Sequence, residues 1–222
     1  MFKRNESGEH ERVKQFLFEC LKRDNPIQTS KDSKQCIYTE ERLEYNLPGY
    51  SDVKYVFPDV YLESNGSNFA VEYQKSIAKA CTIPNKLKAY AEIGVFANYI
   101  LGTEVYLPIL DFKNLNIRGL STEAEDMFNL FGEIYTASFG KGGRISILRV
   151  KIKEKGLEGF DDFIKPFEIE GKNGEIIKIQ EHYQPVRIHA ERLERLVLKP
   201  RTVDFNDTST NFAAGRYLIA GF

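Results

Sequence analysis

Two carboxylates and an amide in the stretch Tyr55–Ser76, YVFPDVYLESNGSNFAVEYQKS, are the side chains of this chain best placed to do chemistry. Asp59 begins a run rich in β-branched and aromatic residues, and Glu72 and Gln74 lie in a second such run. Successive strand residues face opposite sides of a sheet, so Glu72 and Gln74 share one face. If the two runs pair as strands, Asp59, Glu72 and Gln74 converge. Carboxylate oxygens gathered in this way are the ligands that a hard divalent cation prefers.

The elements that must position these side chains are two adjacent strands joined by a tight turn. We expect strands over Asp59–Glu63 and Phe69–Gln74, because the SNGSN between them has the composition of a hairpin connection. Pro58 directly precedes the first strand, where a proline is tolerated. Asp52 lies in the loop-like SDVK and is the weaker candidate for the first carboxylate. Acidic residues on a hairpin usually form its solvated face, so the pattern alone does not establish a site.

The flanking sequence predicts the rest of the core. Thr82 and Pro84 have the order of a hydroxyl N-cap followed by an early-turn proline, and Gly94 ends the helical run that follows. This order of elements predicts an α/β fold with a central mixed sheet and one helix on each face. The expected elements around the hairpin are an amphipathic helix, an early strand, a second helix and a buried strand, over Gly8–Lys22, Cys36–Glu44, Pro84–Ile93 and Val95–Leu101.

With these elements in place, the chain resembles the PD-(D/E)xK nuclease superfamily and, within it, the competence protein CoiA-like branch. The resemblance covers roughly the first half of the chain and implies a restriction-endonuclease-like core. Gln74 stands where most members have lysine, and CoiA-like proteins look like E-x-Q there. Lys75 cannot take the place of that lysine, because its side chain points to the opposite face. The matching residues are Pro58-Asp59-Val60, Val71-Glu72-Tyr73-Gln74-Lys75-Ser76, Tyr90, Gly94, and His10 with Lys14 on the first helix.

The resemblance implies a metal-dependent nuclease that hydrolyses phosphodiester bonds in DNA, in recombination, DNA uptake or defence. Asp59, Glu72 and the main-chain carbonyl of Tyr73 would hold Mg²⁺ or Mn²⁺. Gln74 would orient the attacking water or contact phosphate, because a neutral amide is a poor general base. The alternative is a non-catalytic DNA-binding or scaffold protein on a degenerate nuclease fold. In the nuclease interpretation Glu72 is a half-exposed carboxylate. In the alternative it pairs with a lysine, Lys79 or Lys86, and holds the sheet against a helix.

Four side chains are candidate nucleic-acid contacts: His10, Lys75, Lys79 and Lys86. Cations at this end of the sheet would hold phosphates and offset the negative field of the carboxylates. A run of exposed lysines is, however, most often a solvated face. The net charge of −1 gives no overall attraction to nucleic acid, so any DNA contact must come from a local basic patch.

Composition limits the other possibilities. A hydrophobic fraction of 42% is enough for a core, and no apolar run approaches the ~20 residues needed to span a bilayer. Three scattered cysteines and no signal peptide predict a protein of the reducing cytoplasm. His182 and His189 lie in no zinc-binding pattern, and no phosphate-binding GxxxxGK[ST] occurs.

The chain is expected to divide into a nuclease-like domain over residues 1–150 and a C-terminal α+β appendage over residues 151–222. The appendage would contact DNA, form a homodimer or add layers to the core. The elements expected beyond the core are an extended segment, a helix, a strand after a glycine turn, a hairpin around Asn173-Gly174 and a short helix, over Val105–Phe112, Thr122–Tyr135, Ile145–Lys151, Phe167–Gln180 and His189–Lys199.

Overall fold

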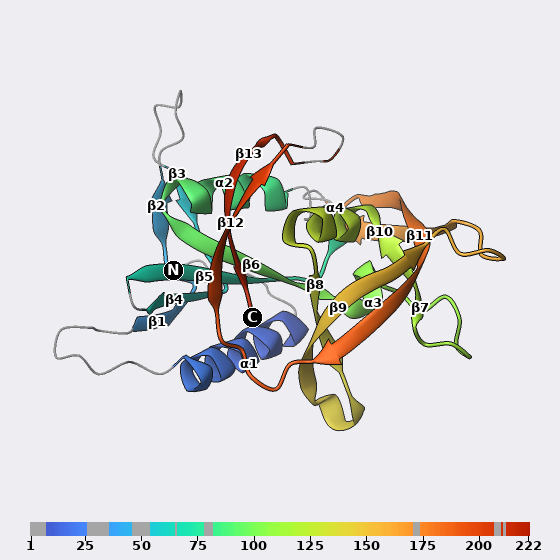
Figure 1. The fold of residues 1–222 in the computed structure, drawn as a ribbon, viewed down its shortest axis with the longest axis horizontal. Coiled ribbons are helices and arrows are strands. Elements are labelled where there is room, and N and C mark those ends of the chain that lie inside the picture. Colours follow the sequence, from blue (N-terminus) through green and yellow to red (C-terminus); the bar gives the residue numbers. More distant parts are fainter. Residues whose placement is uncertain are drawn as a thin grey trace.

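The computed structural model describes residues 8–25, 36–45, 54–64, 66–77, 82–170, 174–206, 210 and 212–222. This part of the chain has the expected α/β class, with a large mixed sheet and a few helices (Figure 1). The helices are α1 (Gly8–Asp24), α2 (Ile83–Glu92), α3 (Thr103–Tyr106) and α4 (Thr122–Phe131). The strands of the large sheet run in the order β1 (Cys36–Thr39), β4 (Val60–Ser64), β5 (Ser67–Gln74), β6 (Val95–Gly102), β8 (Ile134–Phe139), β9 (Ile145–Lys155), β11 (Ile176–Arg192) and β10 (Phe163–Glu170), while β7 (Ile117–Ser121) pairs with β11, and β12 (Lys199–Phe205) pairs with β13 (Gly215–Gly221).

The predicted hairpin and the crossover after it are confirmed. β4 and β5 pair antiparallel, with Val60 opposite Val71. Helix α2 then carries the chain to β6, which lies parallel to β5 with Tyr99 opposite Glu72. Because a parallel pair requires such a crossover, the strand–helix–strand order of the sequence indicated this arrangement correctly.

Helices α1 and α2 cover opposite faces of the sheet, as expected (Figure 1). Val13 and Leu17 of α1 share one buried cluster with Val71 of β5. Leu87 of α2 shares the other cluster with Ala70, the neighbouring residue of the same strand. The alternation of β5 therefore decides which helix each of its side chains meets.

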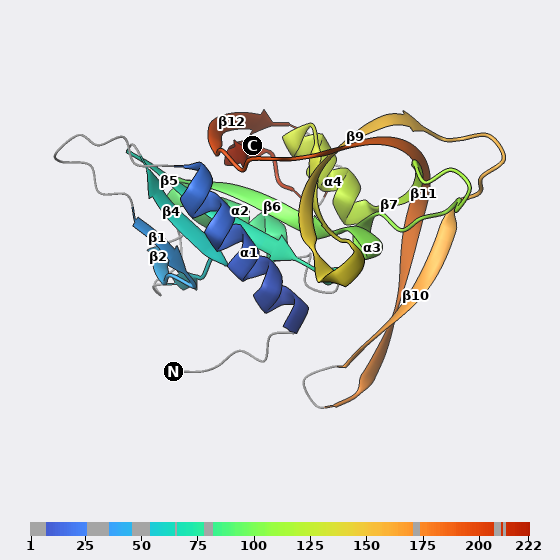
Figure 2. The ribbon, with the colours of Figure 1, turned by 90° about the horizontal axis from the view of Figure 1, so that it is seen from below.

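The C-terminal strands belong to the same sheet and the same core. β9 runs through residue 150 without a break, and β11 pairs with β7, β9 and β10. β13 lies beside β6, in the middle of the sheet. Tyr183, Phe205 and Tyr217 are buried in the cluster that α2 covers. The hairpin β10–β11 projects from this body as a long arm (Figure 2). No helix in the described ranges has both the length and the apolar character of a membrane span.

Several expected elements are wrong in the first half of the chain. The strand expected over Cys36–Glu44 is two short strands, because Glu40 takes a left-handed backbone conformation at φ 54° and ends β1. The second piece, β2 (Leu43–Tyr45), pairs with β3 (Lys54–Val56) in a separate small sheet. Thr82 occupies the N-cap position of α2, but its side chain makes no capping hydrogen bond.

The expectations beyond β6 differ in three places. Val105–Phe112 is not extended throughout, because it begins inside the short helix α3. The helix expected to reach Tyr135 ends at Phe131, since Gly132 adopts the left-handed conformation at φ 77° and closes it. The helix expected over His189–Lys199 is absent: its first residues are the end of β11, where Ala190 pairs with Val150 of β9. The predicted strand after the glycine turn is present. The two strands of the hairpin predicted around Asn173-Gly174 pair as β10 and β11, while Asn173 lies outside the described residues.

Candidate functional site

Asp59 and Glu72 are brought to one end of the β4–β5 hairpin by a side chain to main chain hydrogen bond. Asp59 lies directly before β4, and its Oδ2 accepts the N–H of Tyr73 at 2.7 Å. Tyr73 follows Glu72 on β5, so this bond holds the Asp59 carboxylate next to the peptide group between Glu72 and Tyr73. Both carboxylates are buried, each with 4% of its surface exposed. The expectation that Glu72 is half-exposed is therefore wrong.

Glu72 faces helix α2 and is held by two of its side chains. Lys86 Nζ lies 2.7 Å from Oε1 and 2.8 Å from Oε2, and the Tyr90 hydroxyl donates to Oε1 at 2.5 Å. Lys86 and Tyr90 are one helical turn apart, which places both over the same point of β5. Lys86, expected to bind nucleic acid, is thus the counter-ion of Glu72 in this structure.

The electrostatics of Glu72 reflect its burial. Desolvation raises the pKa of its carboxyl group, the Lys86 ammonium opposes that rise, and the negative charge of Asp59 adds to it. The pKa of the Tyr90 hydroxyl is raised well above its ordinary value, first by burial and then by the Glu72 charge. The site is a pair of interacting carboxylates with a single ammonium bound to one of them.

Helix α1 supplies a second set of contacts from the opposite face. His10 Nε2 lies 2.9 Å from Asp59 Oδ1, and the His10 ring lies 5.4 Å from the Tyr73 ring between centroids. The Tyr73 hydroxyl donates to Glu9 Oε1 at 2.7 Å, and Lys75 Nζ donates to Glu9 Oε2 at 2.6 Å. Although burial raises the pKa of Glu9, these two bonds lower it below its usual range. His10 and Lys75, predicted near the site, are indeed beside it.

Glu9 is a residue of the site that the sequence analysis did not identify. A signal was available: Glu9 immediately precedes His10, and a helix whose first turn reaches the site brings both residues there. Glu9 connects Tyr73 of β5 with Lys75, which directly follows the strand.

Gln74 shares the face of Glu72, as predicted, but its amide is engaged locally. Its Nε2 donates to the Ser76 carbonyl oxygen at 2.6 Å, and the side chain is half-buried. Lys14 of the first helix is buried and binds Glu11 at 2.6 Å and Glu40 at 2.7 Å. Lys79 lies outside the described residues.

The side chains at this site suit a cation such as Mg²⁺, which keeps most of its water ligands when it binds to a protein. They are too few to supply all the ligands of a metal ion. No group of three or more His, Cys, Asp or Glu side chains able to hold a metal exists within the described ranges. Mg²⁺ commonly binds through one or two carboxylates together with waters and a substrate phosphate, so the pair Asp59 and Glu72 is sufficient in number. Tyr99 of β6 lies opposite Glu72 in register, and its hydroxyl is buried without a hydrogen-bond partner among the described residues. Burial raises the pKa of this hydroxyl well above its ordinary value, and the charges of Glu72 and Asp59 raise it further. A buried hydroxyl beside two carboxylates is a polar group of the kind that binds an ordered water in proteins.

Comparison with known proteins adds no relative: no family model, no curated protein and no solved structure matches this chain.

Proposed function

We propose that this protein is a metal-dependent nuclease that hydrolyses phosphodiester bonds in DNA, built on a restriction-endonuclease-like core of the PD-(D/E)xK kind. The observation that supports it best is the meeting of two buried carboxylates, Asp59 and Glu72, at the end of a hairpin. Close to them, the Tyr99 hydroxyl has no hydrogen-bond partner among the described residues. Burying two neighbouring like charges costs free energy, and a cation between them would offset that cost.

The roles of the residues follow from their contacts. Asp59, Glu72 and the Tyr73 carbonyl would hold Mg²⁺ or Mn²⁺, which supplies an activated water and neutralises charge that builds on the phosphate. The Tyr73 N–H and His10 orient Asp59, while Tyr90 orients Glu72. Lys86, whose side chain is 31% exposed, binds both Glu72 oxygens and would have to release at least one of them for Glu72 to hold a metal. Gln74 would reach the attacking water only after releasing Ser76.

A second candidate function is favoured by one specific contact. The ion pair between Glu72 and Lys86 joins β5 to α2, which is the arrangement expected if Glu72 is structural. Together with Gln74 in place of the usual lysine, this contact favours a non-catalytic DNA-binding or scaffold protein on the same fold. Such a protein would neither cleave DNA nor respond to divalent cations.

The experiment that separates the two combines cleavage with thermal melting. Labelled single-stranded, duplex and branched DNA are incubated with the wild type and with Glu72→Gln, in Mg²⁺, in Mn²⁺ and in chelator, and both proteins are melted under the same conditions. We expect the wild type to cleave only with metal and to melt higher in its presence. Glu72→Gln should lose at least about a hundredfold in cleavage rate and most of the metal-dependent rise in melting temperature. A wild type that neither cleaves nor is stabilised by metal would leave the binding protein as the correct function.

A further inference from the structure

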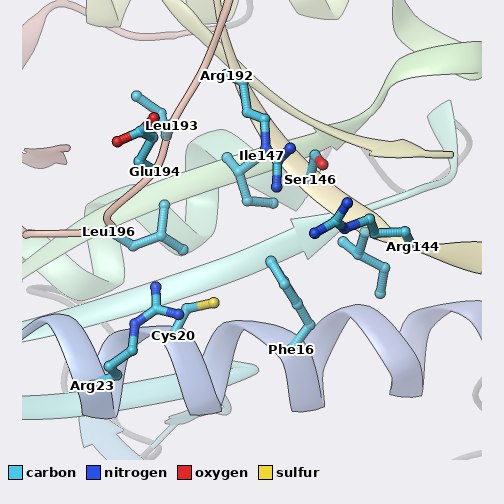
Figure 3. A pocket seen from close by; sticks show the side chains of 11 residues that line it. Phe16, Cys20, Arg23, Arg144, Ser146, Ile147, Arg192, Leu193, Glu194 and Leu196 are labelled. Carbon is cyan, nitrogen blue, oxygen red and sulfur yellow. The ribbon is translucent and has the colours of Figure 1, made fainter.

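A hollow that combines charge with an apolar floor lies away from the two carboxylates, between α1 and the strands that cross it. Its volume is about 570 Å³, and residues of α1, of the start of β9 and of the end of β11 with the segment after it line its wall. Figure 3 shows Arg23 rising from α1, and Arg144 and Arg192 pointing from the strand side toward the same space. We call this hollow the arginine pocket.

Two of the three guanidinium groups have no partner among the described residues. Arg23 is neutralised by Asp24, with Nε 2.7 Å from Oδ1 and Nη2 2.8 Å from Oδ2. The side chains of Arg144 and Arg192 have no hydrogen bond or ion pair to any described residue, and the pocket's one carboxylate, Glu194, pairs with none of the described arginines. The arginine pocket therefore carries an uncompensated positive charge on two rigid forks.

The chemistry of these groups selects a phosphate. A guanidinium presents parallel N–H donors that match two oxygens of a phosphate, and it remains charged at every accessible pH. The half-buried ring of Phe16 and the side chain of Ile147 form the floor. A flat aromatic surface beside cationic forks suits a nucleotide, with its phosphate on the arginines and its base against the ring.

A smaller cavity lies between the arginine pocket and the α1 side of the candidate site, where His10 contacts Asp59. Glu9 and Lys75 line this cavity together with Ser138 and Phe139, which pair with Ser146 and Ile145 of the arginine pocket. Arg12 bridges the two, with its guanidinium 5.8 Å from the centre of the Phe139 ring and its Nη2 2.8 Å from the Gly143 carbonyl oxygen.

We propose that the arginine pocket binds the phosphate backbone of a DNA strand whose scissile phosphate lies at Asp59 and Glu72, an inference that rests on the proposed function. His10 and Cys20 mark the two places along α1 and are separated by about 15 Å at the helical rise. That span corresponds to about four nucleotides of a B-form strand. This local patch also answers how a chain of net charge −1 attracts a polyanion.

The test measures binding without cleavage. Fluorescence anisotropy with a labelled single-stranded and a labelled duplex oligonucleotide is recorded in chelator over a series of salt concentrations, for the full chain and for Arg144→Gln/Arg192→Gln. Both residues are exposed, so the double variant should melt as the wild type does. We expect affinity to fall by about tenfold or more and the slope of log affinity against log salt to shrink by about 1.5, since each lost phosphate contact contributes about 0.7 to 0.9. Arg23 is left in place because its partner Asp24 also accepts the Leu196 N–H at 2.8 Å.

The matched control is Lys151→Gln/Lys153→Gln, which removes the same charge from exposed positions further along β9. Equal losses in the two double variants, or no loss in either, would overturn the proposal. The proposal would also be overturned if the wild type bound inorganic phosphate at Arg144 and Arg192 while added phosphate left its affinity for the oligonucleotides unchanged. A wild type that binds DNA through Arg144 and Arg192 but never cleaves it refutes the proposed nuclease, and with it the placement of a scissile phosphate at Asp59 and Glu72, but leaves DNA binding by the arginine pocket standing. If Arg144→Gln/Arg192→Gln keeps full affinity for DNA and still cleaves it, the arginine-pocket inference is refuted and the proposed nuclease stands.

Discussion

At the scale of single residues, the Lys86 ammonium neutralises the buried negative charge of Glu72, as a bound metal ion would. A buried carboxylate needs a compensating charge, and in this structure Lys86 provides it at 2.7 Å. If Asp59 and Glu72 together form a cation site, the ammonium and the metal compete for the same oxygens. The competition is measurable by stability, independently of any cleavage.

We expect Lys86→Met to destabilise the metal-free protein by about 2 to 4 kcal/mol, because it leaves the buried Glu72 charge unpaired. Mg²⁺ should then restore much of that loss, and should raise the melting temperature of the variant more than that of the wild type. Differential scanning fluorimetry over a Mg²⁺ titration measures both effects. Lys88→Met, on the exposed side of the same helix, is the control and should show neither. A variant that is destabilised but indifferent to Mg²⁺ would assign the Glu72 and Lys86 pair to structure alone.

A second pair of acidic side chains, Glu123 on α4 and Glu181 on β11, sets a pH dependence. Burial raises the pKa of Glu123 to about 7, and the neighbouring Glu181 carboxylate adds to the rise. Glu123 Oε2 is buried and has no hydrogen-bond partner in the described part of the chain. Because the pKa in the folded state lies above that in the unfolded state, the protonated group favours folding. That contribution is complete below about pH 4.5 and is lost as the pH rises through about 7.

Glu123→Gln should therefore stabilise the protein increasingly between pH 5 and pH 8. The amide resembles the protonated acid, so the gain should be small at the acidic end and reach about 1 to 3 kcal/mol at the alkaline end. Urea unfolding at both pH values gives the difference. Glu181→Gln should act in the same direction, since burial also raises the pKa of Glu181. An effect of equal size at both pH values would contradict this origin.

At the scale of elements, the sequence predicted what local pattern determines. The β4–β5 hairpin, α1, α2 and β6 have clear periodicity and clear turn residues, and they are the elements that carry the candidate site. The errors fall where tertiary pairing outweighs local preference. His189–Arg192 has the charged pattern of a helix, but it is strand because β9 pairs with it. Ile134 completed an apolar helical stripe in the sequence, but Gly132 ends the helix and Ile134 opens β8.

The contacts of the site were less predictable than its residues. Convergence of Asp59 and Glu72 followed from the alternation of one hairpin. Their partners Lys86, Tyr90 and His10 depend on how α1 and α2 cross the sheet, and no local pattern fixes that crossing. This is why Glu72 was expected to be half-exposed when it is buried, and why Glu9 was overlooked.

At the scale of the whole molecule, the position of β13 decides how the two halves depend on each other. β13 pairs with β12 and lies parallel to β6, so the last residues of the chain sit beside a central strand. Asn98 of β6 donates to the Ala220 carbonyl oxygen at 2.7 Å, and the Phe222 N–H donates to the Tyr135 hydroxyl at 3.1 Å. The C-terminal strands thus cover the sheet that carries the site.

We expect a chain that ends at residue 150 to lose cooperative unfolding, because the cut falls inside β9 and removes much of the core around α2. Thermal melting followed by circular dichroism would show a gradual loss of signal in place of a transition. The buried residues lost from that cluster are Tyr183, Val186, Ile188, Phe205, Phe212, Tyr217 and Ile219.

The matched control removes chain from the same C-terminal part without touching the core. Residues 169–177 lie in the sequence between Glu168 of β10 and Lys178 of β11, which pair in register, and Ile176 and Ile177 in this range are 60% and 41% exposed. Joining Glu168 to Lys178 by Asn-Gly supplies a favoured two-residue turn. The shortened protein should melt within a few degrees of the wild type and keep its response to metal and DNA, since residues 174–177 of the removed range are exposed. A cooperative transition in the chain of residues 1–150, or collapse of the shortened-arm protein, would show that the core is divided differently from the continuous sheet described above.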